Sequence, residues 1–352
     1  MQVNLTIKDR TFFLKTQDEL VDQYCRPIRD LRVSVIDSCN FRCSYCMPPE
    51  NEYHFLPSDQ RLSFDEIIDI TKVFVSLGVR KIRITGGEPL LRKNIAELVQ
   101  RFTGIPGIED LSLTTNGYLL SKFAGVLKDA GLNRITISVD TLDPAQFQQI
   151  TSSADGLDRL MAGIEAAEKA GFKKIKINAV IRKGQNEDAI IPLVNEFLPR
   201  GHIVRFIEFM DVGNTNQWNL EKVVSSRSML NILSELGPLV PIKKNYFGEV
   251  ASRYEFLDGK GEVGFISSVS QPFCGTCTRA RLSADGKLFT CLFAEKGIDL
   301  KTPLRSGKSL EVLKEKVLET WSGRLDRYSE ERVGEQSEGR SRKKVEMYHI
   351  GG

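Results

Sequence analysis

Apolar runs with a period of two alternate with apolar residues at helical spacing over the first two thirds of the chain. The first pattern predicts strands and the second predicts helices. The S-x-x-E sequence Ser63–Glu66 is a capping box that marks the start of the first helix. The expected strands are 30–36, 81–85, 110–115, 134–139, 174–181 and 203–209. The expected helices between them are 64–77, 95–102, 121–130, 157–170 and 188–198.

This strand–helix alternation implies parallel strands with right-handed crossovers, which fits either a doubly wound sheet or a barrel. The polar residues favour a barrel, because they fall at or near the carboxyl ends of successive strands. In a barrel these ends converge on one mouth, where active sites form. We therefore predict a partial (β/α)6 TIM-type barrel. The residues at the strand ends are Cys39, Gly87, Thr114, Asn116, Ser138 and Asp140.

The regular alternation ends after Met210. Gly237-Pro238 and Pro241 predict a linker. Short β-like runs and an amphipathic helix are expected beyond it. The later elements are a helix at 226–236, strands at 253–257 and 262–267, and a helix at 309–321.

We expect residues 1–240 to form the barrel and residues 241–352 to form an α+β extension. The stretch 324–344 is highly charged, which predicts that it is mobile. The chain nevertheless ends on apolar residues followed by Gly351-Gly352. Two glycines form the thinnest backbone available, so this end is suited to a narrow pocket.

Composition and charge exclude several classes of protein. The chain has 352 residues, of which 41% are hydrophobic and 27% charged, as in an ordinary globular enzyme. No apolar run reaches the ~18 residues of a membrane span, and residues 1–10 lack a signal-peptide core. The net charge of +3 is too small to indicate nucleic acid or a membrane surface as a partner. We expect a cytoplasmic protein whose seven cysteines are thiols.

Three of these thiols, Cys39, Cys43 and Cys46, form a C-x3-C-x2-C array directly after the first expected strand. Thiolates are soft ligands, and three of them can hold three corners of an iron–sulfur cube while one iron stays open. A structural zinc site is the alternative, but it normally takes four nitrogen or sulfur ligands. Cys25 would be the fourth ligand, although it lies upstream of the whole strand.

The spacing of the three thiols, with Tyr45 before the last, resembles the signature of the radical S-adenosylmethionine (SAM) enzymes. This resemblance also implies a partial barrel. In that superfamily the open iron chelates the amino and carboxylate groups of SAM. An electron from the cluster then cleaves SAM to a 5′-deoxyadenosyl radical.

A second group of three thiols, Cys274, Cys277 and Cys291, again lacks a fourth member. Alone it leaves zinc and a cluster equally open, but the first group favours a second 4Fe–4S cluster. Arg279 and Arg281 lie between Cys277 and Cys291 on an extended segment, so both side chains project to one side. Guanidinium groups suit phosphate and carbonyl oxygens. A solvated basic edge is the alternative.

Six segments together resemble the GTP 3′,8-cyclase family, and the likeness runs from about Arg26 to the end of the chain. Residues 1–25 and the connection 152–158 lie outside it. The second thiol group with its arginines and the glycine pair are the most specific features. The matching segments are 39–48, 85–90, 113–117, 205–210, 273–281 and 351–352.

The resemblance implies a lyase that performs the first step of molybdenum cofactor biosynthesis with two 4Fe–4S clusters and SAM. GTP becomes (8S)-3′,8-cyclo-7,8-dihydroguanosine 5′-triphosphate after hydrogen removal from C3′ and attack on C8. The implied partners are an electron donor, the cyclic pyranopterin monophosphate synthase that acts next, and a second copy in a homodimer.

The resemblance also implies roles for single residues. Cys39, Cys43 and Cys46 would ligate the SAM cluster, and Cys274, Cys277 and Cys291 the second cluster. Arg279 and Arg281 would contact GTP and assist catalysis by stabilising the reduced product radical. Gly86 and Gly87 lack side chains, so their backbone can approach SAM closely, although a plain tight turn is the alternative. The SAM pocket would consist of Tyr45, Gly86, Gly87, Ser138 and Met210.

GTP requires inward-facing cations, and five strand residues of positive charge each interrupt an apolar run. Such charges are costly to bury unless a partner meets them, so a triphosphate in the lumen would explain them. For Lys81 an exposed strand end is the alternative. Thr114 resembles a further GTP contact. The five cations are Arg32, Lys81, Arg83, Lys176 and Arg205.

Two other functions fit parts of the sequence. The first is a radical SAM enzyme that modifies peptides or RNA with auxiliary clusters, but two auxiliary clusters would need more than seven cysteines. The second is a zinc-binding module without enzymatic activity.

Overall fold

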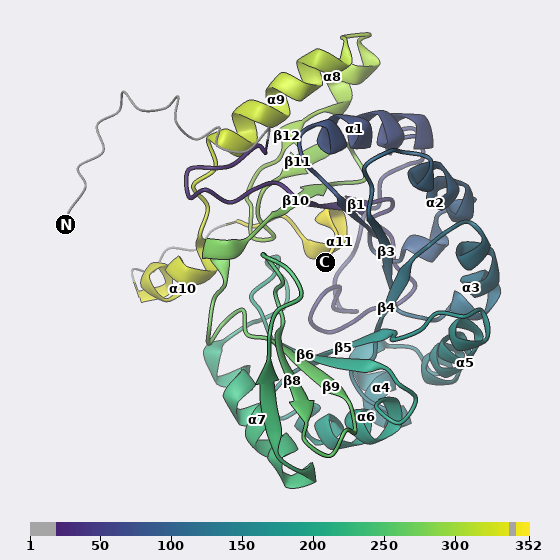
Figure 1. Cartoon of the computed structure of the whole chain (residues 1–352), viewed down its shortest axis with the longest axis vertical. Helices are drawn as coiled ribbons and strands as arrows, with labels where there is room; N and C mark the ends of the chain where they lie inside the picture. The colour runs from purple at the N-terminus through teal and green to yellow at the C-terminus, as the bar shows by residue number, and fades with distance from the viewer. Residues whose placement is uncertain (1–18, 338–342) are drawn as a thin grey trace.

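Six parallel strands form the centre of one twelve-stranded sheet in the computed structural model of the chain, which describes residues 19–337 and 343–352. They pair in chain order, which confirms the predicted α/β core. In Figure 1 they curve around a central space. The strands are β1 (Asp30–Ser34), β2 (Lys81–Thr85), β3 (Asp110–Thr115), β4 (Arg134–Ser138), β5 (Lys176–Ile181) and β6 (Ile203–Glu208).

Helices cover the outer side of these strands (Figure 1). The predicted capping box is confirmed, since Ser63 Oγ accepts from the Glu66 amide and the Glu66 carboxylate accepts from the Ser63 amide. One helix was not predicted, because eight residues with only two large apolar side chains give little periodic signal. The helices are α1 (Phe64–Ser76), α2 (Ile95–Thr103), α3 (Leu120–Asp129), the unpredicted α4 (Pro144–Thr151), α5 (Gly156–Lys169) and α6 (Ile190–Phe197).

Alternation along the strands separates the core from the central space. Leu31 and Val33 of β1 are fully buried in the hydrophobic core. Arg32 between them lines the central cavity, as Arg83 does on β2. This is the period of two that side chains follow along a strand. Each cation that interrupts an apolar run can therefore face the lumen.

The C-terminal part of the chain extends both edges of the same sheet. At one edge β10 lies parallel to β1, and at the other β9 lies parallel to β6. The predicted linker at 237–241 is wrong, because Pro241 lies in β7. A proline is tolerated there because β7 is the edge strand. These strands are β7 (Leu239–Ile242), β8 (Ser252–Phe256), β9 (Glu262–Ile266), β10 (Arg279–Leu282), β11 (Lys287–Phe289) and β12 (Ile298–Asp299).

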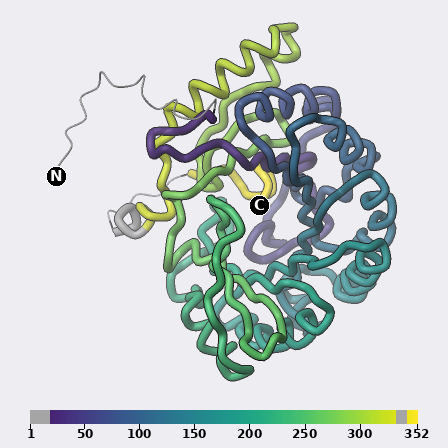
Figure 2. The backbone as a smooth tube through the Cα atoms, viewed as in Figure 1, coloured from purple at the N-terminus to yellow at the C-terminus, as the bar shows by residue number. Residues whose placement is uncertain are grey.

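The remaining helices wrap the chain back to the barrel. In Figure 2 the last residues end in the space enclosed by the sheet. These remaining helices are α7 (Ser226–Leu233), α8 (Lys301–Arg305), α9 (Leu310–Ser322), α10 (Tyr328–Ser337) and α11 (Met347–Ile350). Five short 3-10 turns complete the described elements: η1 (Pro89–Leu91), η2 (Glu187–Ala189), η3 (Leu220–Lys222), η4 (Ser234–Leu236) and η5 (Cys274–Thr276).

The prediction that 324–344 is mobile is wrong for the residues that the structure describes. Arg324 and Arg332 are only 4% and 1% exposed. Arg332 donates to Asp211 at 2.7 Å, and Lys344 donates to the same carboxylate at 2.5 Å. Buried ion pairs with the barrel thus hold a stretch whose composition suggested solvent. The segment 338–342 lies outside the described residues, as does 1–18. No helix in the described part of the chain is long and apolar enough to cross a membrane.

Candidate active site

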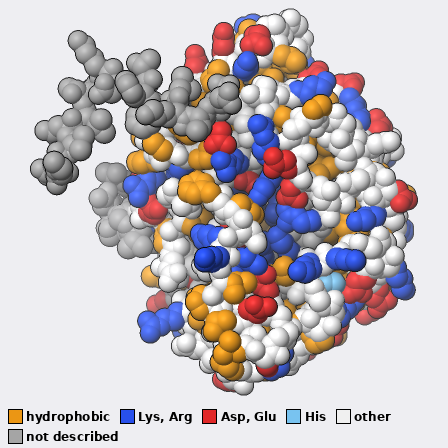
Figure 3. Space-filling model, in the orientation of Figure 1, with side chains coloured by type: hydrophobic (Ala, Val, Ile, Leu, Met, Phe, Trp, Pro, Cys, Tyr) orange, Lys and Arg blue, Asp and Glu red, His pale blue; other side chains and the backbone are white. Residues whose placement is uncertain are grey.

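A cavity of about 320 Å³ occupies the space enclosed by the sheet, and both thiol groups line it. This is the size range of small-molecule sites. Figure 3 shows Lys and Arg side chains gathered around a hollow in the middle of one face of the molecule. The two thiol groups come from opposite ends of the sequence. They meet because β10, which follows Cys277, pairs with β1, which precedes Cys39.

The first thiol loop is held by the unpredicted helix α4. The amides of Arg42 and Ser44 donate at 2.9 Å to the last carbonyls of α4, those of Thr151 and Ile150. A helix leaves these carbonyls without partners of its own. On the other side, Asn116 Nδ2 lies 3.7 Å from Cys39 Sγ. Contacts with α4 and with Asn116 therefore hold this loop on both sides.

Burial raises the pKa of all three thiols in this loop. For Cys39 burial and the nearby Glu88 raise the pKa to about 11. For Cys43 and Cys46 burial is again the main cause, and neighbouring thiols add to it. The protein itself therefore does not stabilise thiolates here. A positively charged metal group would supply that stabilisation.

Beside this loop, Glu88 connects the segment that follows β2 to the carboxyl end of β3. Its carboxylate accepts from Thr115 Oγ1 at 2.7 Å and from the Asn116 amide at 2.8 Å. Burial raises the pKa of Glu88 to about 7 despite these hydrogen bonds. These hydrogen bonds explain why the G-G-E-P segment (86–89) and the T-T-N-G segment (114–117) lie side by side.

The residues predicted to bind SAM all lie on the cavity wall: Tyr45, Gly86, Gly87, Ser138 and Met210. Tyr45 Oη donates to Asp140 at 2.7 Å. Gly87 has a packing reason of its own, because a Cβ there would overlap the Ser38 carbonyl. A Cβ at Gly86 would overlap the Ile36 carbonyl in the same way. Both glycines thus let the backbone before Cys39 pass closely.

Three arginines lie in register on neighbouring strands of the wall. Arg281 of β10 is opposite Arg32 of β1, and Arg32 is opposite Arg83 of β2. Burial and repulsion from Arg281 lower the pKa of Arg32. Burial and repulsion from Arg279 lower the pKa of Arg281 to about 10. Burial and repulsion from Arg134 lower the pKa of Arg83. Clustered buried cations of this kind favour an anionic ligand.

Unpartnered polar atoms lie along the same wall. Thr114 Oγ1, Asn178 Oδ1 and Arg205 Nε are buried without a hydrogen-bond partner among the described residues. Buried polar atoms normally have partners, so these three fit a polar ligand. Burial, followed by Arg83, lowers the pKa of Arg205 to about 10.

One predicted contact lies off the wall and several wall residues were not predicted. Lys176 is not among the lining residues, although its charge interacts with Arg205. Lys81 does line the cavity, and its Nζ lies 2.9 Å from the centre of the Tyr246 ring. Tyr246 comes from a loop without periodic pattern, so no local signal predicts its place on the wall. Asn178, as a polar residue within an apolar strand, carried a signal that was overlooked. The other unpredicted polar residues on the wall include Asp30, Asp110, Arg134 and Glu249.

The second thiol loop differs electrostatically from the first. Burial opposes ionisation of Cys277, but Arg279 and Arg324 outweigh it and lower its pKa to about 6. Burial and Asp326 instead raise the pKa of Cys291 to about 12. Among the described residues, no three His, Cys, Asp or Glu side chains surround a point that could hold a single metal ion.

Family comparisons cover most of the chain. Residues 33–197 match the Radical SAM superfamily, and residues 202–330 match Molybdenum Cofactor Synthesis C. A GTP 3′,8-cyclase of Xanthomonas campestris pv. campestris is 54% identical over 94% of this chain and 97% of its own length. A GTP 3′,8-cyclase of Staphylococcus haemolyticus is 47% identical over 95% and 99%.

The chain belongs to the GTP 3′,8-cyclase family. Among solved structures, Streptococcus suis SuiB bound to S-adenosylmethionine matches with a TM-score of 0.59 and 16% identity, covering 83% of this chain and 67% of that one. This likeness supports the radical SAM fold. Membership of the superfamily implies a 4Fe–4S cluster and SAM. The donor set of this cyclase-family chain fits them, since one loop presents three soft thiols to the cavity.

The end of this cyclase-family chain reaches the cavity. Gly352 lies on the wall, and Thr85 Oγ1 donates to its carbonyl at 3.4 Å. Arg281 Nη1 donates to the Gly351 carbonyl. Gly351 has φ +76°, and a Cβ there would overlap Thr85 Cγ2. Only glycine meets both conditions without strain.

Proposed function

We propose that the chain is a GTP 3′,8-cyclase, the lyase of the first step of molybdenum cofactor biosynthesis. Its reaction converts GTP to (8S)-3′,8-cyclo-7,8-dihydroguanosine 5′-triphosphate. The observation that carries the proposal is the shared cavity, in which two groups of three thiols and a row of arginines face one space. Family membership over nearly the whole chain supports the same reaction.

Each thiol group would hold one 4Fe–4S cluster. Cys39, Cys43 and Cys46 would hold the cluster that binds SAM, and the wall residues Tyr45, Gly86, Gly87, Ser138 and Met210 would surround SAM. Cys274, Cys277 and Cys291 would hold the second cluster, whose open iron would meet the guanine edge. When bound, the first cluster and SAM supply the one-electron chemistry that removes the hydrogen from C3′ of GTP.

The chain's own residues would fix GTP at both ends. Arg32, Lys81, Arg83 and Arg205 line the lumen and would meet the triphosphate through charge-assisted hydrogen bonds. Lys176 does not line the cavity, but it lies on the same face of β5 as the wall residue Asn178 and would add positive charge nearby. The orphaned Thr114 Oγ1 would contribute another bond. Holding the ribose and guanine in one orientation makes the C3′–C8 bond formation effectively intramolecular. Arg279 and Arg281 would stabilise negative charge on the reduced product.

Partners follow from this reaction. The chain would take two electrons per cycle from an electron donor, one to cleave SAM and one, with a proton, to reduce the cyclised radical, and would pass its product to the cyclic pyranopterin monophosphate synthase. We also propose a homodimer, and a division of the chain into a barrel of residues 1–240 and an extension of residues 241–352.

Nucleotide selectivity tests the proposed reaction. Anaerobically reconstituted protein is incubated with SAM, a reductant and GTP, ATP, CTP or UTP in turn. We expect 5′-deoxyadenosine together with a cyclised product from GTP alone. Equal turnover of ATP would contradict guanine recognition at the second cluster.

Removing the Arg281 guanidinium is expected to lower turnover at least tenfold. A charge-assisted hydrogen bond is worth about 1.5–3 kcal/mol, and each 1.4 kcal/mol corresponds to about one factor of ten. Turnover and iron content of Arg281→Ala are measured beside Arg305→Ala, whose side chain pairs with Glu66 outside the cavity. Unchanged turnover in Arg281→Ala would refute a role for this side chain.

Binding of GTP is expected to take up a proton at Lys176. Burial and the charges of Arg205, Arg134 and Arg83 lower the pKa of Lys176 to about 6, so the free amine is neutral above that pH. A bound triphosphate raises this pKa, and affinity therefore falls as pH rises above about 6. Calorimetry in buffers of different ionisation enthalpy, at mildly alkaline pH, measures the uptake. Lys176→Met should reduce it, whereas the exposed Lys173→Met should leave it unchanged.

A further inference from the structure

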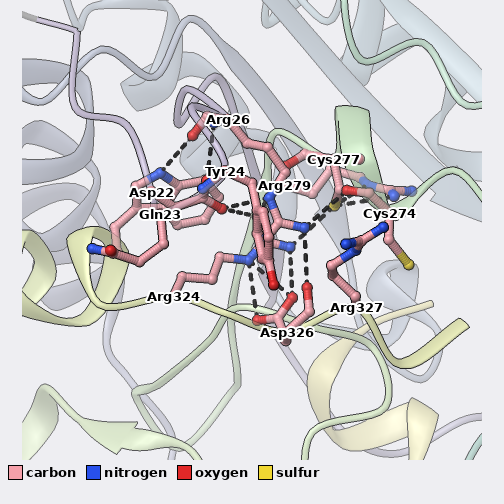
Figure 4. A network of polar contacts seen from close by, with 12 residues as sticks. Asp22, Gln23, Tyr24, Arg26, Cys274, Cys277, Arg279, Arg324, Asp326 and Arg327 are labelled. Atoms are coloured by element: carbon pink, nitrogen blue, oxygen red, sulfur yellow. Dashed lines mark hydrogen bonds and ion pairs between the residues drawn. The ribbon is translucent and has the colours of Figure 1, made fainter. Parts of the chain in front are cut away.

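The loop that carries Cys274 and Cys277 is held by two segments far from it in sequence. Its own regular structure is the single turn η5. One segment, residues 22–29, precedes β1, and the other, residues 324–330, follows α9. Figure 4 shows both converging on the loop with their charged side chains directed at it.

Arg26 fixes the first thiol of this loop through the backbone. Its Nη1 donates to the Cys274 carbonyl at 2.8 Å and to the Asp326 carbonyl at 3.0 Å. Its Nε pairs with Asp22 at 2.5 Å, and both side chains are fully buried. The Trp321 indole donates to the Arg26 carbonyl at 3.0 Å. The segment before β1, which includes residues outside the family resemblance, is therefore part of the second thiol site.

Arg324 contacts the second thiol directly. Its Nη1 donates to the Cys277 carbonyl at 2.9 Å, and its Nη2 lies 3.3 Å from Cys277 Sγ. Arg279 approaches the same sulfur at 3.2 and 3.4 Å. One sulfur thus receives two guanidinium groups, one from a strand of the cavity wall and one from the C-terminal segment.

Two carboxylates orient Arg324. Its Nε donates to both Asp326 oxygens at 3.0 Å, and its Nη1 lies 3.6 Å from Asp22 Oδ2. The Arg324 side chain is only 2% exposed, and a buried cation is costly without such partners. Asp22 is shared with Arg26, so the backbone contact at Cys274 and the sulfur contact at Cys277 belong to one network.

We propose that Arg324, oriented by Asp22 and Asp326, is a positioning residue that fixes the Cys277 sulfur and sets the reduction potential of the second cluster. The inference rests on the second cluster of the proposed function. Hydrogen bonds and positive charge at a ligand sulfur stabilise the reduced cluster, so Arg324 makes its potential less negative. Asp326 has the opposite effect, since it adds negative charge beside the same site. A network that merely fastened the two segments together would give no such pair of opposite effects.

The test measures the midpoint potential of the second cluster by redox titration followed with electron paramagnetic resonance. The full-length chain carries Cys39→Ala, Cys43→Ala and Cys46→Ala, so that the second cluster alone gives the signal. Arg324→Gln and Asp326→Asn are added separately. Arg305→Gln is the control, because Arg305 also pairs with a carboxylate and donates to main-chain carbonyls, but lies far from the cavity.

For Arg324→Gln we expect the ratio of reduced to oxidised cluster at a fixed potential to fall at least tenfold, a shift of about 59 mV to more negative values. For Asp326→Asn we expect a shift to less negative values, and for Arg305→Gln none. An unchanged potential in both loaded variants, or shifts of the same sign, would overturn the inference. If Arg324→Gln fails to load iron, the sign of the shift in Asp326→Asn decides. Absence of iron and sulfide from the triple-alanine chain itself would overturn the second cluster as well.

Discussion

Replacing Cys39, Cys43 and Cys46 together by alanine is expected to remove about half of the iron and to abolish 5′-deoxyadenosine formation, because in the proposed function each thiol group would hold a cluster of its own. The three thiols line the cavity together, and burial is the main cause that raises their pKa values. Iron and sulfide are measured after anaerobic reconstitution, and 5′-deoxyadenosine after addition of SAM and dithionite.

Cys25→Ala provides the matched control for this experiment. Cys25 is exposed and is not on the cavity wall, so its loss should leave iron content and SAM cleavage at the level of the unmodified chain. SAM cleavage that persists in the triple variant would end the radical SAM interpretation of the first loop. Loss of iron in Cys25→Ala would instead favour a four-thiol site.

Deleting Gly351 and Gly352 is expected to leave cluster content and SAM binding intact and to reduce formation of the cyclised product sharply. The tail lies in the cavity, where Arg281 donates to the Gly351 carbonyl. Gly351→Ala should reproduce most of the loss, because a Cβ would overlap Thr85 Cγ2 and because φ at this position is +76°. Product is quantified at saturating GTP and SAM.

Gly307→Ala separates backbone strain from the loss of fit in the cavity. Gly307 has φ +74°, close to that of Gly351, but a Cβ there meets nothing within 4 Å. This variant should lose a little stability and keep full product formation. If the tail-deleted chain makes product at the full-length rate, Gly351 and Gly352 have no role in product formation.

Much of the fold could be predicted because the parallel core has strong local signals. The capping box at Ser63 and the predicted strands 81–85 and 110–115 agree with the structure to the residue. Helix α4 has only eight residues and escaped prediction. Strand β7 escaped it because Pro241 resembles a linker, and its place at the sheet edge cannot be inferred from local sequence.

The residues of the site also fall into those that local sequence patterns predict and those that depend on contacts distant in sequence. Thiol spacing and cations within apolar strands are local patterns, and the cavity wall includes nearly all residues predicted from them. Arg324 and Arg332 were assigned to a mobile stretch, because their burial depends on contacts with Cys277 and Asp211. Those partners are 47 and 121 residues away along the chain. No pattern within one segment contains that information.

In the proposed reaction the cavity brings the SAM-derived radical to C3′ of GTP, and isotope transfer tests this most directly. The reconstituted chain is incubated with SAM, a reductant and GTP that carries deuterium at C3′. Mass spectrometry of the 5′-deoxyadenosine should then show one deuterium, accompanied by loss of that deuterium from the cyclised product. 5′-Deoxyadenosine without deuterium, formed beside unchanged GTP, would contradict the account.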